Sequence, residues 1–407
     1  MAHQAFLPSG THASPSTCQV WTYLHSLRRL GPVVFIMDGR SCTPIPYAEA
    51  KSSQTGPRHK PGDLNTNLHS INNTSYSPVW RLLRRNLVSG VVNPCKASKS
   101  STQVQRMALD ILLKSLKKEA KANGGVVVPV HSIQHSVSFL MTSLCFGVAL
   151  DEDVVDKIKN VQVGLLSLVD NRYALNLLPK EDIVSFKPQF LDASIWPACA
   201  ALEWIMSRLV KHQDIQQKLK KEIRSVVGDK KGLVDVEELQ RMPYLKAVIF
   251  EALRRHSPAH FLIPHRVKED VMIMADHHEY LIPRGAVVNY LVTSVGLDAS
   301  VWEEPLEFRP ERFMPGGEGE EVDVNCGKRE IKMMPFGAGR RICPGSDMAV
   351  LQLQYLVANF VNEIIELKAV EGMEVDLSDK AELFVAMKNP LGHSMHALSL
   401  INLILYP

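Results

Sequence analysis

The chain has 407 residues, of which 46 are Lys or Arg and 43 are Asp or Glu, so the formal net charge is +3. With 45% hydrophobic residues, this balance excludes a disordered, collagen-like or coiled-coil protein, and it argues against a dedicated nucleic-acid binder. The seven cysteines are scattered and never spaced as C-x-x-C, which favours a reducing compartment over a disulfide framework or a zinc site.

Residues 1–78 contain only three acidic side chains among many Ser, Thr, Pro and His, and we expect a divergent N-terminal segment there. The shortage of acids also fits a transit peptide, an alternative that the residues leave open. No run reaches the roughly eighteen apolar residues that crossing a bilayer requires. The predicted domain spans residues 79–407.

Beyond this segment, apolar residues recur at spacings of three and four, which is typical of amphipathic helices. The pattern predicts helices over residues 103–120, 133–146, 153–169, 198–227, 243–256 and 344–366. Short strands are expected at 271–275, 280–283 and 286–289, where turn residues separate apolar runs, and residues 316–321 read as a polar surface loop. The prediction is a mainly α chain with a small β region.

The sharpest motif is residues 336–345, here called the cysteine loop, which reads F-x-x-G-x-R-x-C-x-G. Its glycines let the backbone bend tightly and approach a flat ligand, because they have no β-carbon. A helix expected to open at Pro344 would aim the N–H groups of Gly345 and Ser346 at the Cys343 sulfur and favour negative charge there. A thiolate held in this way suits haem iron, and Arg341 could neutralise a carboxylate of the same cofactor.

The cysteine loop allows two other interpretations. Gly337 and Gly339 hint at a dinucleotide-binding fingerprint, but Ile342 occupies the third glycine position and no β-branched strand leads in. A plain buried cysteine is a common role for a free thiol. Five fixed residue types at set spacing, however, arise by chance in only about one in ten thousand chains of this length.

With this motif the chain resembles the cytochrome P450 family, especially plant microsomal members, over a gapped stretch from about Ile71 to Leu391. The resemblance implies the P450 fold, here with a truncated N-terminal part and a shortened segment before the long central helix. It implies haem b as the cofactor, with Cys343 as the iron ligand. It also places Phe336, Arg341 and Gly345 among the cofactor-binding residues.

Three residues match another family mark. Glu251 and Arg254 form an E-x-x-R pair on one face of a predicted helix, and Arg312 lies in a P-E-R-F segment. Alone, an E-x-x-R pair is usually a solvated helix surface. The resemblance implies instead that the three residues form a buried triad, with the structural role of clamping the loop before Cys343.

Trp80 and Arg84 match the family's W-x-x-x-R, whose spacing of four places both hydrogen-bond donors on one helix face. Alone, the pair would fit a core Trp beside a surface Arg; beside the cysteine loop we expect both to bind haem propionates. His265 stands where many relatives place a propionate-binding arginine. We expect His256 at the surface.

The long helix over the haem departs from the family. Relatives carry an acid and a threonine where this chain has Trp196 and Pro197. Splitting dioxygen needs protons, and a hydroxyl backed by a carboxylate is a positioned proton relay. Tryptophan cannot relay protons as a carboxylic acid does, and Pro197 removes an amide donor and should kink the helix. Asp192 and Ser194 are candidate substitutes, although Asp192 also fits an N-cap or a surface acid, so we expect an impaired relay and assign no catalytic residue.

The resemblance implies a monooxygenase that inserts one atom of dioxygen into an apolar small molecule, with electrons from NADPH through NADPH-cytochrome P450 reductase. A basic face could dock that partner; it comprises Arg81, Arg85, Lys114 and Lys117. Two alternatives stay open, namely a peroxide-rearranging haem enzyme that needs no reductase and a non-catalytic haem-binding remnant. The substrate is not indicated.

The family also implies a monomer on the cytosolic face of the endoplasmic reticulum membrane. This sequence shows no apolar N-terminal anchor, so a cytosolic location is an alternative, and a plastid location fits less well. Only 42 residues separate Gly147 from Phe190, where relatives use a far longer segment to roof the substrate pocket. A shortened gene model, a splice form or a decayed copy would explain both features.

Overall fold

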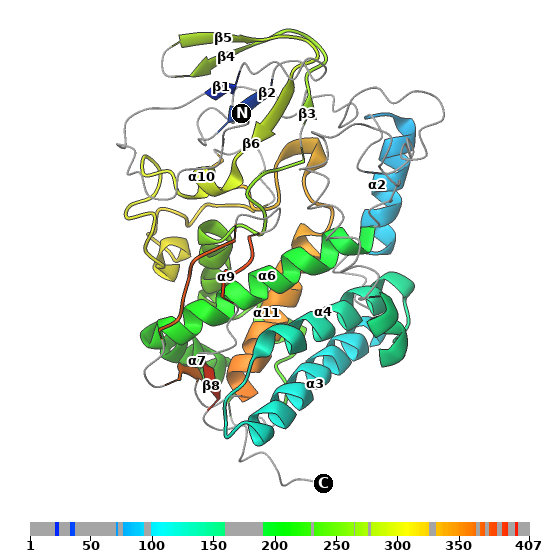
Figure 1. The fold of residues 1–407 in the computed structure, drawn as a ribbon, viewed down its shortest axis with the longest axis vertical. Coiled ribbons are helices and arrows are strands. Elements are labelled where there is room, and N and C mark those ends of the chain that lie inside the picture. The colour runs from blue at the N-terminus through cyan, green and yellow to red at the C-terminus, as the bar shows by residue number, and fades with distance from the viewer. Residues whose placement is uncertain are drawn as a thin grey trace, which may run out of the picture.

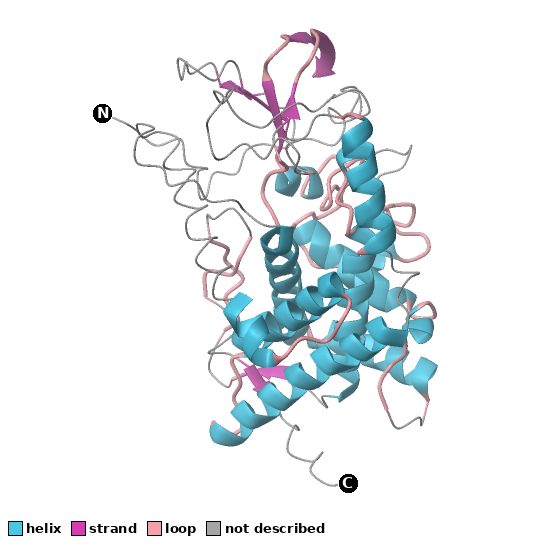
Figure 2. Cartoon of the chain, turned by 90° about the vertical axis from the view of Figure 1, so that its right-hand side faces the viewer, coloured by secondary structure: helices cyan, strands magenta, loops and turns pink. Residues whose placement is uncertain are grey.

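The computed structural model describes residues 21–23, 33–36, 71, 76–92, 99–158, 190–228, 232–263, 265–275, 278–324, 331–363, 367–370, 374–380, 385–389 and 395–397. Helices fill most of the molecule, and the larger sheets gather at one end (Figure 1). The view turned by 90° shows the same division (Figure 2). The expected class, mainly α with a small β region, is confirmed. The predicted shortened segment falls mostly on residues 159–189, outside the described residues.

The helices lie close to their predicted positions. They are α2 (Pro78–Gly90), α3 (Lys99–Ala122), α4 (Pro129–Phe146), α6 (Phe190–Lys211), α7 (Gln213–Val227), α8 (Val236–Leu239), α9 (Pro243–Arg255), α10 (Val292–Gly296) and α11 (Ser346–Glu363), with 3-10 turns η3 (Pro310–Phe313) and η4 (Gly339–Arg341). Residues 152–158 are also helical. The predicted helix 198–227 is wrong in two respects. The helix begins at Phe190, and His212 leaves the helical conformation and separates α6 from α7.

The described strands form three sheets, of which the pair formed by residues 367–369 and 395–397 lies at the opposite end of the helices from the others (Figure 1). The largest has the strand order β1 (Trp21–Tyr23), β2 (Val33–Ile36), β6 (Val287–Tyr290) and β3 (His265–Arg266), with β2 parallel to β6 and the other pairs antiparallel. The other two sheets are the pairs β4 (Val271–Ala275) with β5 (His278–Ile282), and β7 (Leu367–Ala369) with β8 (Met395–Ala397). Strand β2, from the N-terminal segment, therefore completes a sheet with residues of the predicted domain.

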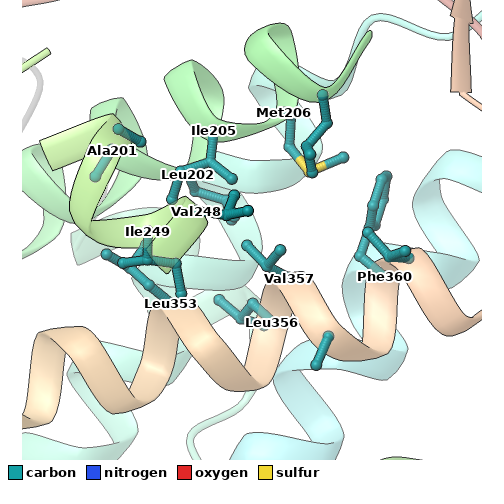
Figure 3. Close-up of a cluster of buried hydrophobic side chains, with 14 of the residues drawn as sticks. Ala201, Leu202, Ile205, Met206, Val248, Ile249, Leu353, Leu356, Val357 and Phe360 are labelled. Carbon is teal, nitrogen blue, oxygen red and sulfur yellow. The ribbon is translucent and has the colours of Figure 1, made fainter. Parts of the chain in front are cut away.

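The core that positions the cysteine loop is formed where α6, α9 and α11 meet (Figure 3). Each helix contributes buried apolar residues at spacings of three and four, which place them on one helix face. They include Leu202, Ile205 and Met206 of α6, Val248 and Ile249 of α9, and Leu353, Leu356, Val357 and Phe360 of α11. Burying one such side chain contributes about 1.5–3 kcal/mol. The start of α11, directly after the cysteine loop, is thereby fixed relative to α6.

Within the described part of the chain, no helix has both the length and the apolar character needed to span a membrane.

His256, expected at the surface, is buried where α9 ends against α6. Its ring stacks on the Trp204 ring with centroids 3.8 Å apart, and its Nε2 accepts a hydrogen bond of 2.9 Å from Arg208 Nε. Burial, followed by the Arg208 cation, lowers the pKa of His256 well below its usual 6.5. The expectation was wrong because His256 is buried by α6, which is distant in the sequence, and the residues next to His256 do not indicate that contact.

We expect the free energy of unfolding to decrease as the pH falls below about 6.5, because unfolded His256 then takes up a proton that the folded state excludes. This contribution is complete above about pH 6.5 and declines below it by up to about 1.4 kcal/mol per pH unit. His256→Gln, whose amide oxygen can still accept from Arg208, should show a shallower decline in denaturant titrations. The exposed His131 provides the control His131→Gln, and equal slopes for all three proteins would contradict the prediction.

Candidate functional site

The cysteine loop folds back on itself through backbone hydrogen bonds. The Cys343 N–H donates to the Phe336 carbonyl at 2.8 Å, and the Gly337 N–H donates to the Met334 carbonyl at 2.9 Å. Gly337 and Gly339 have φ angles of 75° and 67°, in the left-handed region that residues with a β-carbon rarely adopt. These glycines therefore allow the chain to return to Phe336.

Cys343 lies half-buried just before α11. The helix begins at Ser346 and not at Pro344, so Pro344 and Gly345 form a turn, and the expectation of a helix opening at Pro344 is wrong by two residues. Burial raises the pKa of the Cys343 thiol, whereas a hydrogen bond from the Gly345 N–H and the positive charge of Arg84 oppose that rise. Both opposing contacts favour the thiolate, the form that binds metal.

Helix α2 carries Trp80 and Arg84 to the cysteine loop. The helix starts at Pro78, and the Ser77 side chain caps it by accepting from the Trp80 N–H at 3.2 Å. One turn later, the Arg84 guanidinium lies 5.9 Å from the Trp80 ring centre and donates to the Ile342 carbonyl. The predicted alignment of these two residues on one helix face is confirmed.

Arg341 packs against the same tryptophan. Its Cζ lies 4.6 Å from the Trp80 ring centre, and its Nη1 and the Trp80 Nε1 both donate to the Ile71 carbonyl, at 3.1 and 3.0 Å. Burial, followed by the nearby Arg84 cation, lowers the pKa of Arg341 to about 10. Two guanidinium groups that repel each other beside an indole N–H form a region of positive potential suited to an anionic ligand.

His265 of β3 is buried near this region. Its pKa falls to about 4, mainly through burial and then through the Arg341 cation, while a hydrogen bond with the Ile263 backbone opposes the fall. The ring meets Tyr290 edge-on, with centroids 6.3 Å apart. The structure thus places a neutral histidine, a ring with one N–H donor, near Arg341.

Glu251, Arg254 and Arg312 meet in a cluster whose side chains are fully buried. Glu251 accepts from Arg254 Nε at 2.7 Å and from Arg254 Nη2 at 2.8 Å, which is a bidentate pair. Arg312 Nε lies 3.4 Å from Glu251 Oε1. The buried triad implied by the resemblance is confirmed.

The triad holds the chain that leads into the cysteine loop. Arg254 and Arg312 donate to backbone carbonyls within residues 304–307. Trp302, just before that stretch, donates from its indole Nε1 to the Lys332 carbonyl at 3.1 Å. Lys332 lies four residues before the cysteine loop begins. The triad is therefore linked to the loop first through residues 302–307 and then through residues 332–335.

Helix α6 holds the two residues that depart from the family pattern. Pro197 lies inside the helix, and Trp196 and Pro197 are both half-buried. The side chains of residues 190–194 lie outside the described part, so Asp192 and Ser194 as substitute relay groups stay a prediction. The kink expected at Pro197 stays a prediction.

The exposed side of α2 is basic, as expected for Arg81 and Arg85, whereas the other two residues of the predicted basic face, Lys114 and Lys117, lie on α3. Arg81 and Arg85 are exposed, and Arg81 lies 5.9 Å from the centre of the Tyr76 ring. Arg340, which the sequence analysis missed, lies 4.8 Å from the same ring and is also exposed. The two consecutive arginines at 340 and 341 could have indicated that one of them adds to the basic surface. One arginine faces inward to Trp80, and the other adds to the outer surface.

The donors gathered here fit a flat ligand that carries both a metal ion and carboxylates. The half-buried sulfur of Cys343 is a soft ligand suited to iron, and the N–H donors of Trp80, Arg84 and Arg341 supply hydrogen bonds and positive charge. Among the described residues, no group of three or more His, Cys, Asp or Glu side chains is arranged to hold a metal ion.

Comparisons with known proteins agree with this chemistry. The sequence model of the family described as Cytochrome P450 matches residues 32–199 and 176–395. The chain is 32% identical over 397 residues to Cytochrome P450 89A9 of Arabidopsis thaliana, covering 80% of this chain and 76% of the relative. It is 28% identical over 374 residues to pluviatolide synthase of Podophyllum peltatum, covering 79% and 74%.

A solved structure supports the fold. The zebra fish cytochrome P450 with progesterone superposes with a TM-score of 0.70 at 16% sequence identity, covering 93% of this chain and 95% of that one. At this identity the likeness concerns the fold alone, and it confirms the predicted architecture.

Removing the negative charge of Glu251 should lower the free energy of unfolding by about 3–5 kcal/mol, because two buried guanidinium groups lose their shared partner. We expect Glu251→Gln to show this loss in a denaturant titration. The exposed Glu237 of α8 provides the control Glu237→Gln, which should change stability by less than about 0.5 kcal/mol. Similar losses in the two variants would contradict the structural importance of the triad.

Proposed function

Since the chain belongs to the cytochrome P450 family of haem oxidoreductases, we propose that Cys343 is the thiolate ligand of the haem iron. The observation that carries this proposal is the setting of the sulfur, which receives the Gly345 N–H and the charge of Arg84 at the end of a loop closed by two left-handed glycines. Both contacts hold negative charge on the sulfur when it binds metal.

The propionates would be bound by the donors around Trp80. Trp80, Arg84 and Arg341 now donate to backbone carbonyls, and a carboxylate is a stronger acceptor for the same N–H groups. His265, kept neutral beside Arg341, is proposed as a further donor. Phe336 and Gly345 are proposed to line the cofactor on the side of the cysteine loop.

Haem, when bound, supplies the redox chemistry that inserts one atom of dioxygen into an apolar small molecule. The protein supplies the thiolate, the orientation and a water-poor site. We assign the electrons to NADPH through NADPH-cytochrome P450 reductase, which would dock on the basic surface formed by Arg81 and Arg85 of α2 and by Arg340 of η4.

The protein is proposed to act as a monomer on the cytosolic face of the endoplasmic reticulum membrane, with a cytosolic location as the alternative. We further propose that residues 79–407 form the haem domain, and that β2, from residues 1–78, completes its sheet by pairing with β6.

Trp196 and Pro197 favour a weakened proton supply. Neither side chain offers a hydroxyl or a carboxyl group, and both are half-buried in α6. The same observation favours a second candidate function, a peroxide-rearranging haem enzyme that works without reductase, since such a reaction does not need protons delivered to dioxygen. A non-catalytic haem-binding protein is the outcome if neither activity is found.

The first test is the absorption spectrum of the reduced, carbon-monoxide-bound protein. We expect the strongly red-shifted Soret band of a thiolate-ligated haem, and we expect Cys343→Ala to abolish it. Cys145→Ala removes another half-buried cysteine and should leave the band intact. A red-shifted band that survives in Cys343→Ala would show that another residue is the iron ligand.

The second test concerns the proton supply. With purified reductase, NADPH and the apolar probe 7-ethoxycoumarin, we expect most electrons to appear as hydrogen peroxide and few as product. The double variant Trp196→Asp/Pro197→Thr should raise product per NADPH by about tenfold or more, because it supplies a carboxylate and a hydroxyl. Trp196→Phe, which adds neither group, serves as the control. Tight coupling in the unaltered protein would refute the weakened relay.

A further inference from the structure

We propose that Glu318 is the fourth member of the buried charge cluster around Glu251 and a positioning residue for the cysteine loop. The part of this inference that concerns the sulfur rests on the proposed role of Cys343. The loop that carries Glu318 was expected to be a polar surface loop, but Gly319 is buried, and Gly317 and Glu318 are half-buried.

The first argument is charge balance. The triad contains one carboxylate, that of Glu251, and two guanidinium groups, and all three side chains are fully buried. Such a set carries an excess positive charge, and burying an unbalanced charge is costly. Glu318 Oε1 pairs with Arg312 Nη1, and three-quarters of the Glu318 side chain is buried, with 25% exposed. Two carboxylates then balance two guanidinium groups.

The second argument is the backbone on either side of Glu318. A β-carbon at Gly317 would lie 2.3 Å from the Arg312 carbonyl oxygen, and one at Gly319 would lie 2.9 Å from the Phe313 ring. The Gly319 N–H also donates to the Arg312 carbonyl at 2.8 Å. Only residues without a β-carbon allow the backbone to come this close to Arg312, and this close approach places Glu318 beside the Arg312 side chain.

The third argument is the connection to the cysteine loop. Lys332 Nζ donates to the Glu318 carbonyl at 2.6 Å, while the Lys332 carbonyl accepts from Trp302. Two residues later, the Met334 carbonyl accepts from the Gly337 N–H inside the cysteine loop. The backbone of Glu318 therefore helps to hold residues 332–334, which directly precede the cysteine loop.

A neighbouring glutamate provides a matched control. Glu320 belongs to the same loop and is exposed, and its carboxylate accepts from the Gly316 N–H at 2.8 Å. Removing the charge of Glu320 tests the loss of one loop carboxylate without disturbing Arg312. If the glutamates only shape the loop, the two positions should behave alike.

The experiment compares Glu318→Gln, Glu318→Asp and Glu320→Gln by amide hydrogen exchange of residues 331–343 in the folded protein. We expect Glu318→Gln to lower the protection of the Gly337 and Cys343 amides by about tenfold. Glu318→Asp keeps the charge and should retain most of the protection, and Glu320→Gln should equal the unaltered protein. Equal effects of the two Gln variants, or of Asp and Gln at 318, would overturn the proposal.

A spectroscopic measurement extends the test to the sulfur. In the reduced, carbon-monoxide-bound protein, Glu318→Gln should convert faster from the red-shifted thiolate band to the shorter-wavelength band of a haem that has lost its thiolate. Conversion at the unaltered rate would overturn the link to Cys343. Absence of the thiolate band from the unaltered protein would contradict the proposed function instead, and the exchange comparison would still decide the role of Glu318.

Discussion

The carboxylate of Glu251, shared between two buried arginines, is the interaction on which the site depends. Neither guanidinium could remain out of water without a partner, and each uses its other N–H groups to hold backbone carbonyls of residues 303–307. The ion pairs thus convert a loop with little regular structure into a fixed support for the segment before the cysteine loop.

Two elements bring chemistry to that support from opposite ends of the sequence. Helix α2 carries a tryptophan and an arginine toward the sulfur, and α11, packed on α6 and α9 through its apolar face, fixes the cysteine loop that precedes it. Burial raises the pKa of the Cys343 thiol, whereas the Gly345 N–H and the Arg84 cation oppose that rise. This setting supports the proposal that Cys343 binds the haem iron.

The predictions that the structure confirms rest mostly on residues spaced by three or four positions along one helix. Trp80 with Arg84 and Glu251 with Arg254 share helix faces whatever packs around them, so their placement could be foreseen. The exceptions depend on distant contacts. His256 is buried because α6 crosses the end of α9, and the pairing of Glu318 with Arg312 could not be foreseen from an acidic, glycine-rich stretch. Helix α11 begins at Ser346 because Pro344 and Gly345 form the turn that ends the cysteine loop.

The parallel pairing of β2 with β6 has a consequence for biosynthesis. Val33 pairs with Val287, so the ribosome must add more than 250 residues before the second strand exists. At about 5–20 residues per second this wait lasts roughly 13–50 s. Throughout it, the edge of β2 that later meets β6 stays open to any other extended chain, a recognised route to aggregation. Until residues 287–290 have been made, β1 is the only described strand that can pair with β2, so this sheet is completed late in synthesis.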